Sequence, residues 1–144
     1  MSKRRHKARV LAMQALYQWQ QTGQNLTEIC DQFIEREDGK SFTSSFFREL
    51  MHGVPTHLSE VDESLGPVLD RSVESLDLVE RAIVRLGVYE LMHRVDVPYR
   101  VVINEWVDVA KEFGSEQGHK FVNGVLDKVS KTARSIEMGK SAEK

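Results

Sequence analysis

The sequence predicts an all-α protein of about six or seven helices. Apolar residues recur at intervals of three and four along almost the whole chain, which is the period of an amphipathic helix. Only three of the 144 residues are proline, and no alternating run or hairpin turn indicates a strand. With 40% hydrophobic residues, a chain of this length can bury a substantial core.

The first two helices are predicted from an apolar stripe and a capping pair. Gly23 is expected to end the first helix. Asn25 followed by Glu28 resembles a capping box, so the second helix is expected to run from there to about Arg36. The stripe on the first helix comprises Ala8, Leu11, Ala12, Ala15, Leu16 and Trp19.

The next segment is predicted to be a broken helix. Aromatic and aliphatic residues at helical spacing run from Phe42 to Val54, and the pattern resumes between Leu58 and Leu65. Pro55 lies between the two runs, and proline kinks or breaks a helix because it lacks the amide proton. Two helical pieces are therefore expected here.

Three further helices complete the predicted fold. Asp77 with Glu80 is a second capping pair, and the helix after it is apolar on so many sides that it is expected to be central and largely buried. A turn follows at Pro98. Gly114 is expected to close the next helix and Ser115 to cap the last one.

The chain is predicted to form one domain followed by a short tail. The domain is expected to span residues 1–134, and residues 135–144 are expected to form a disordered tail. Cys30 is the single cysteine, which excludes an internal disulfide framework and a cysteine-rich zinc site. No apolar run approaches the length of a membrane span. A cytoplasmic protein without membrane contact is therefore expected.

The basic start of the chain is its most informative functional feature. Residues 1–27 carry five of the 20 basic residues and none of the 22 acidic residues. The N-terminal end of a helix already carries partial positive charge, so cations there are expected to need an external anion. Nucleic-acid phosphates are such an anion, and the more acidic remainder suits a different partner. The five cations are Lys3, Arg4, Arg5, Lys7 and Arg9.

Other residues extend this interpretation to a nucleic-acid site. Tyr17 lies about 180° from the apolar stripe, where its ring either stacks on an unpaired base or packs against a second helix layer. Phe121 lies at the edge of the apolar face of the last helix. Asn104 and Asn123, inside helices, more often mark an internal hydrogen bond than a ligand contact. A second basic patch on the last helix comprises Lys120, Lys128, Lys131 and Arg134.

Catalysis and metal binding are not expected. The spacing Glu-x-x-His supplies ligands in di-iron helix bundles, but only Glu90 and His93 are expected to point inward, and one pair cannot hold two metals. The favoured interpretation of Glu90 is a buried carboxylate paired with a neighbour such as Arg94. No phosphate-binding glycine loop or nucleophile motif is present, so no cofactor is expected. The pairs are Glu49/His52, Glu90/His93 and Glu116/His119.

Four segments, in order and at compatible spacing, carry a resemblance to a known family. They are residues 4–19, 79–91, 97–105 and 120–127. Over residues 3 to about 130 the chain resembles the NusB family of bacterial transcription antitermination factors. The resemblance implies two small helical bundles packed side by side. It also implies binding to boxA RNA together with NusE, a small-subunit ribosomal protein, on the RNA polymerase elongation complex with other Nus factors.

The resemblance also implies site residues. The surface facing NusE would include Glu74 and Glu80. Lysines at positions 3 and 7 bind phosphate without the planar fork of arginine, so base stacking at the helix start would be reduced. The implied RNA-binding residues are Lys3, Arg4, Arg5, Lys7, Arg9, Tyr17, Gln117, Lys120, Phe121 and Asn123.

The expected function is therefore that of a non-catalytic RNA-binding factor that promotes processive elongation, including that of ribosomal RNA operons. Two alternatives remain open. One is a helical protein–protein adaptor whose basic start is a solvated arm. The other is a detached RNA-binding domain of the kind found in ribosomal-RNA cytosine methyltransferases, although no glycine-rich methyl-donor motif is present.

Overall fold

The computed structural model describes residues 3–137, which form seven α-helices and two short 3-10 helices without any strand. The all-α prediction is thus confirmed. The 3-10 helices, η1 (Gly66–Val68) and η2 (Val73–Ser75), lie between the fourth and fifth α-helices. The α-helices are α1 (Lys3–Thr22), α2 (Leu26–Arg36), α3 (Ser44–Thr56), α4 (Leu58–Leu65), α5 (Leu78–His93), α6 (Tyr99–Phe113) and α7 (Glu116–Ala133).

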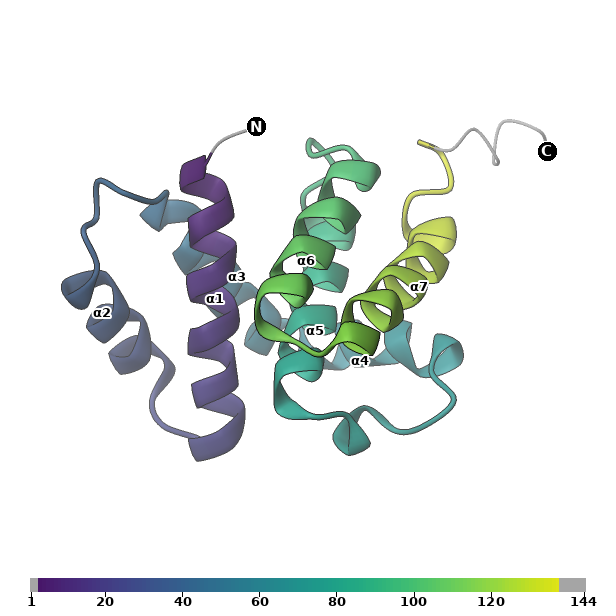
Figure 1. Cartoon of the computed structure of the whole chain (residues 1–144), viewed down its shortest axis with the longest axis horizontal. Coiled ribbons are helices and arrows are strands. Elements are labelled where there is room, and N and C mark those ends of the chain that lie inside the picture. Colours follow the sequence, from purple (N-terminus) through teal and green to yellow (C-terminus); the bar gives the residue numbers. More distant parts are fainter. Residues whose placement is uncertain (1–2, 138–144) are drawn as a thin grey trace.

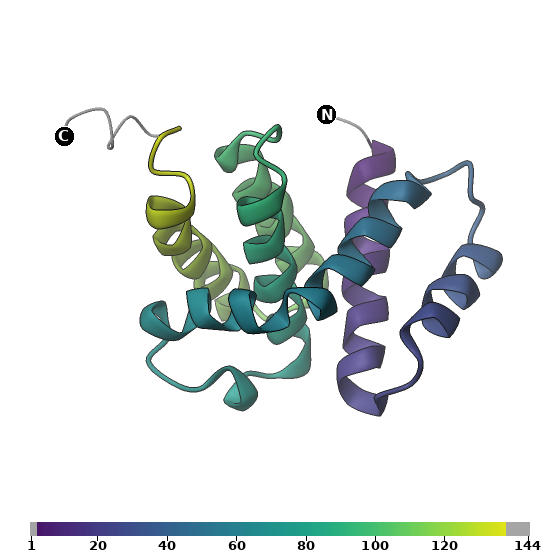
Figure 2. The ribbon, with the colours of Figure 1, turned by 180° about the vertical axis from the view of Figure 1, so that it is seen from behind.

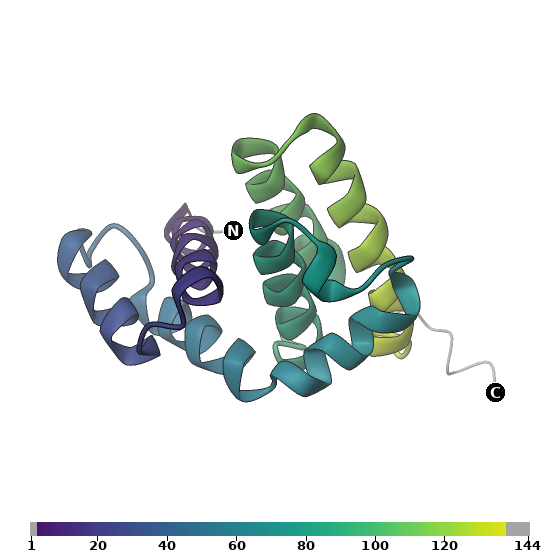
Figure 3. The ribbon, with the colours of Figure 1, turned by 90° about the horizontal axis from the view of Figure 1, so that it is seen from below.

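The helices form two groups, and α1 lies between them. It packs against α2 and α3 on one side and against α5 and α6 on the other (Figure 1). In the second group α5 is central, in contact with α4, α6 and α7. Seen from behind, α3 and α4 run across the back of both groups (Figure 2), and the view from below separates α2 and α3 from the α5–α7 group (Figure 3). One face of the molecule therefore consists of α1, α6 and α7.

Most helix ends follow from local sequence signals. The side chains of Asn25, Asp77 and Ser115 each accept a hydrogen bond from the backbone N–H three residues later, at 2.9–3.0 Å. Gly23 ends α1 with φ of +69°, in the left-handed region that glycine adopts without strain. Gly114 ends α6 in an extended conformation. The predicted caps are confirmed.

The predicted break between α3 and α4 lies at His57. Pro55 occupies the last turn of α3. His57 has φ of −109° and ψ of 28°, outside the helical region, and α4 begins at the next residue. The backbone of His57 nevertheless continues the hydrogen bonding of α3, because its N–H donates to the carbonyl of Gly53 at 2.9 Å.

The core is continuous across both groups and is centred on α5. All residues of α5 from Ala82 to Leu91 are buried, which confirms the prediction of a central helix. Two of them, Arg85 and Glu90, are charged and are paired with other helices. Arg85, for example, donates two hydrogen bonds to the carboxylate of Asp62 on α4, at 2.9 and 3.0 Å.

The end of the described chain folds back onto α6. A carboxylate oxygen of Glu137 accepts a hydrogen bond from the backbone N–H of Tyr99, the first residue of α6, at 2.9 Å. Residues 135–137 of the predicted tail thus have a described position, whereas residues 138–144 lie outside the described part of the chain. Among residues 3–137, no helix combines the length and the apolar character that a membrane crossing requires.

Candidate nucleic-acid interface

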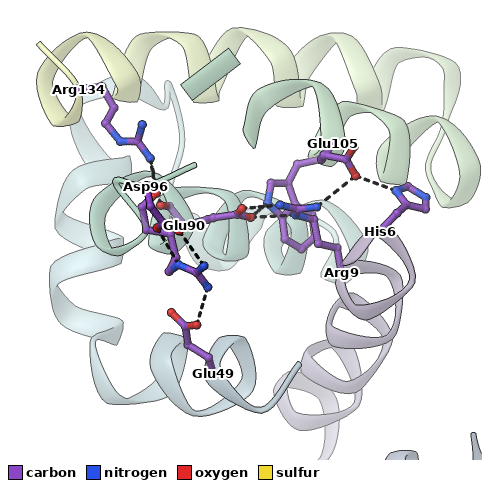
Figure 4. Close-up of polar contacts among 9 residues, drawn as sticks. His6, Arg9, Glu49, Glu90, Asp96, Glu105 and Arg134 are labelled. Atoms are coloured by element: carbon purple, nitrogen blue, oxygen red, sulfur yellow. Dashed lines mark hydrogen bonds and ion pairs between the residues drawn. The ribbon is translucent and has the colours of Figure 1, made fainter. Parts of the chain in front are cut away.

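The start of α1 is attached to the second helix group by a buried ion pair (Figure 4). The side chain of Arg9 is fully buried, and its Nη2 and Nε atoms lie 2.6 and 3.0 Å from the two carboxylate oxygens of Glu90 on α5. Its Nη1 donates to Glu105 on α6 at 3.2 Å. The indole N–H of Trp106 donates to Glu90 at 2.8 Å. Hydrogen bonds to both carboxylate oxygens offset the cost of removing these charges from water.

Two predictions about these residues are therefore wrong. Arg9 does not reach the surface and is not available to bind RNA phosphate. Glu90 pairs with Arg9 on α1 instead of with Arg94 four residues later. The guanidinium of Arg94 donates to Glu49 at 2.8 Å and to Asp96 at 3.0 Å. The hydrogen bond from Arg94 lowers the pKa of Asp96 to about 2.

A buried aromatic ring helps to organise the arginines at this end of α1. The ring of Phe46 on α3 lies 5.6 Å from the guanidinium of Arg5, 5.0 Å from that of Arg9 and 5.2 Å from that of Arg94. These distances are within the range of cation–π attraction. Arg5 is half-buried, so its guanidinium is positioned by α3 close to the surface.

The remaining cations of the basic start lie closer to solvent. Lys3 and Arg4 are exposed, and Lys7 is half-buried. Arg4 donates to a backbone carbonyl of the α2–α3 connection at 3.0 Å, and Lys7 donates to a hydroxyl of the same connection at 2.9 Å. These contacts hold both side chains near the first turns of α1. A cluster of oriented cations is a suitable site for phosphate groups.

Carboxylates of the protein itself neutralise part of the positive charge at the start of α1. His6 Nδ1 lies 2.9 Å from Glu105, and His6 Nε2 lies 3.8 Å from Glu112, both on α6. Together with Glu90, these carboxylates bring acidic groups of the second helix group to α1. The expectation of an external anion therefore does not hold for Arg9.

Tyr17 borders a shallow hollow at the other end of α1. The hollow, of about 370 Å³, also involves Val79 of α5, Phe113 at the end of α6, and Gly114 and Ser115 of the α6–α7 connection. Tyr17 is half-buried and the side chain of Phe113 is 39% exposed. Tyr17 thus borders residues of α5 and α6 at a partly open surface, and stacking of its ring on an unpaired base stays a prediction. Aromatic rings at an open surface can stack on unpaired bases.

The predicted RNA-binding residues of α7 lie on different sides of that helix. Lys120 and Phe121 border a hollow against η1. Asn123 borders a separate hollow against α6, opposite Asn104. Gln117 is exposed in the first turn. The structure therefore does not bring Phe121 and Asn123 to a single patch.

The expectation that the two asparagines form internal hydrogen bonds is wrong. Asn104 and Asn123 are both exposed, and their hollow of about 320 Å³ is also bordered by Tyr99 and Arg100. Amide and guanidinium groups can form paired hydrogen bonds with base edges. Tyr99, Arg100 and Phe113 were missed from the sequence because only the packing of α6 against α1 and α7 places them at these hollows.

Arg134 does not belong to the predicted basic patch of α7, because it is only 3% exposed. Its guanidinium donates to the backbone carbonyls of Leu91 at 2.6 Å and Arg94 at 2.8 Å. It thus satisfies carbonyl groups at the C-terminal end of α5 that have no partner within the helix. The remaining members of the patch, Lys120, Lys128 and Lys131, are exposed.

One of the two predicted partner residues, Glu80, lies next to the start of α7. Glu74 in η2 is exposed, and Glu80 in the first turn of α5 is half-buried. Burial, followed by the neighbouring charge of Asp77, raises the pKa of Glu80. A Cβ atom on Gly118 of α7 would lie 3.0 Å from a carboxylate oxygen of Glu80. The acidic start of α5 therefore adjoins the predicted RNA-binding residues of α7.

The predicted RNA-binding residues form an extended track instead of a compact patch. The cations of α1 and the first turn of α7 lie at opposite ends of the face formed by α1, α6 and α7 (Figure 1). With a rise of 1.5 Å per residue, Lys3 and Tyr17 are separated by about 21 Å along α1. An RNA must therefore extend over at least this distance to contact both ends of the track.

Known proteins are similar to this chain over nearly its whole length. Residues 6–131 match the NusB family. The transcription antitermination protein NusB of Pseudomonas fluorescens is 53% identical over 137 residues, which cover 95% of this chain and 82% of that protein. The NusB structure from T. maritima superposes with a TM-score of 0.81 at 32% identity, covering 92% of this chain and 94% of that one. A crystal structure of antitermination factors NusB and NusE in complex with dsRNA superposes with a TM-score of 0.81 at 30% identity, covering 91% and 98%.

Proposed function

Because this chain belongs to the NusB family, we propose that it is a non-catalytic RNA-binding factor that acts with NusE in transcription antitermination. The observation that carries the proposal at the level of the site is the extended track on the face of α1, α6 and α7. It begins with oriented cations and continues to aromatic rings and amide groups. This order of groups suits a single RNA strand better than a small-molecule substrate.

The cations at the start of α1 bind the phosphates of the RNA. Lys3 and Arg4 are exposed, and Arg5 and Lys7 are half-buried at the same end of the helix. Neutralising phosphates in this way releases counterions, so the affinity falls as the salt concentration rises. Arg9 contributes indirectly, because its ion pair with α5 holds the start of α1 in place.

Unpaired bases bind further along the face. The ring of Tyr17, with that of Phe113, offers a stacking surface. Gln117 and Lys120 continue the track along α7. Asn123 then lies on the side of α7 that faces α6, and Phe121 lies on the side that faces η1. A strand that follows α7 can therefore contact either side of this helix.

NusE binds at the acidic start of α5, around Glu74 and Glu80. The net charge of residues 28–144 is −7, from 15 basic and 22 acidic residues, which complements a basic protein partner. Because Glu80 adjoins Gly118 at the start of α7, NusE at this position lies close to the RNA track. Binding of either partner then strengthens binding of the other.

The RNA is a boxA element of a nascent transcript, and the complex acts on the elongating RNA polymerase with other Nus factors. A protein with this role works in the cytoplasm. The relative from Pseudomonas fluorescens is itself described as a transcription antitermination protein, which supports this role over that of a methyltransferase domain.

Fluorescence anisotropy of a labelled boxA RNA tests the proposal. We expect the protein alone to bind boxA more tightly than a scrambled RNA of the same composition, and NusE to increase the affinity further. Equal affinity for both RNAs, unchanged by NusE, would contradict the proposal and favour a helical adaptor with a basic surface.

A further inference from the structure

A cluster of two histidines and one glutamate lies away from the RNA track, where α4 meets the end of α5. His57, Glu60 and His93 each offer one ligand atom, and these atoms lie within 4.8 Å of one another. His57 separates α3 from α4, Glu60 is in the first turn of α4, and His93 is the last residue of α5. The helices α4 and α5 are in contact at the back of the molecule (Figure 2).

The cluster contains His93 of the Glu90/His93 pair but not Glu90. Glu90 is turned into the core toward Arg9, whereas Nε2 of His93 lies 3.1 Å from a carboxylate oxygen of Glu60. The ligand set is therefore formed across two helices. It could not be recognised from the spacing of residues along α5.

A hydrogen bond to the backbone orients the imidazole of His57. Its Nδ1 lies 3.1 Å from the backbone carbonyl of Gly53. A carbonyl oxygen can only accept a hydrogen bond, so Nδ1 carries the proton, and Nε2 of the neutral imidazole has a free lone pair. Histidine ligands of metal ions are commonly oriented in this way, by donating their second nitrogen to a carbonyl group.

Two of the three ligand atoms, those of His93 and Glu60, lie close to the separation that a metal ion requires. The ring of His93 lies 4.4 Å from that of His57 and packs at 4.8 Å against the ring of Tyr89, with 26° between the last two planes. Tyr89 is buried, so its position limits the tilt of His93. Ligand atoms bound tetrahedrally at about 2.1 Å are roughly 3.4 Å apart. The 3.1 Å separation of His93 and Glu60 is already close to this value.

We propose that His57, Glu60 and His93 form a binding site for one divalent transition-metal ion, with zinc the preferred ion. Two imidazoles and a carboxylate are ligands that zinc takes in proteins, and water supplies the fourth position. Half of the Glu60 side chain is exposed, so it can rotate to complete the ligand set. The bound ion fastens the start of α4 to the end of α5.

Calorimetric titration with zinc tests this site on tag-free protein from which metals have been removed with a chelator. We expect one zinc ion per chain. His57→Ala and His93→Ala each remove a ligand and are expected to weaken binding at least about tenfold. The matched control is His119→Ala, because His119 is a half-buried histidine on α7 that is not part of the cluster.

Thermal unfolding gives a second measurement that does not depend on RNA binding. Zinc is expected to raise the melting temperature of the wild type and of His119→Ala, and to leave that of His57→Ala and His93→Ala unchanged. Circular dichroism without metal establishes that each variant is folded. Equal zinc binding by the wild type and the two ligand variants, or no binding by the wild type, would overturn the proposal.

Discussion

Arg9 differs in role from the other cations of the basic start, although the sequence presents them as one run. It is fully buried between Glu90 and Glu105, whereas Lys3 and Arg4 are exposed. One signal in the sequence was available: Arg9 precedes Ala12 and Leu16 of the apolar stripe by three and seven positions, and residues at these intervals share a helix face. Charge alone therefore does not distinguish a phosphate ligand from a structural ion pair.

Replacing Arg9 with methionine tests this distinction. Arg9→Met leaves the carboxylate of Glu90 buried without its cation, so we expect the free energy of unfolding to fall by about 3–5 kcal/mol. Lys3→Ala, at an exposed position, is expected to change it by less than about 0.5 kcal/mol. Urea unfolding measures both values, and a similar small effect for the two variants would rule out the structural role of Arg9.

At the scale of helices, local sequence signals predicted where each helix begins and ends better than they predicted which helices contact one another. The caps at Asn25, Asp77 and Ser115 depend on residues three positions apart, so the sequence contains the whole interaction. The contact between Arg9 and Glu90 joins residues 81 positions apart and depends on how α1 packs against α5. The sequence does not specify which face of α1 meets that helix.

Glycines in helices provide a test of this packing. A Cβ atom on Gly53 of α3 would clash with the side chain of Tyr89 on α5, whereas one on Gly124 of α7 would meet nothing within 4 Å. We expect Gly53→Ala to lower the free energy of unfolding by about 1–3 kcal/mol. Gly124→Ala is expected to raise it by about 0.5–1 kcal/mol, because alanine is the better helix former. Equal effects in thermal or urea unfolding would contradict the close approach of α3 and α5.

At the scale of the whole molecule, α1 links the two helix groups and presents the RNA track on one face. The resemblance to the NusB family supplied the arrangement into two bundles, which helical periodicity alone did not. The resemblance also identified most of the candidate site residues, but only the structure shows where these residues lie relative to one another. Phe121 and Asn123 are two positions apart in the sequence and lie on different sides of α7. Arg134, expected on the surface of α7, is instead bound to the end of α5.

The central claim is that the exposed cations at the start of α1 bind RNA phosphate. The most direct test is the salt dependence of boxA binding by the double variant Lys3→Ala/Arg4→Ala, compared with Arg48→Ala/Arg71→Ala, which removes the same charge from exposed positions on α3 and on the connection between η1 and η2. We expect the slope of log affinity against log salt to decrease in magnitude by about 1.4 for the first variant and to remain at the wild-type value for the second. Identical slopes for the two variants would show that net charge, and not the start of α1, determines RNA binding.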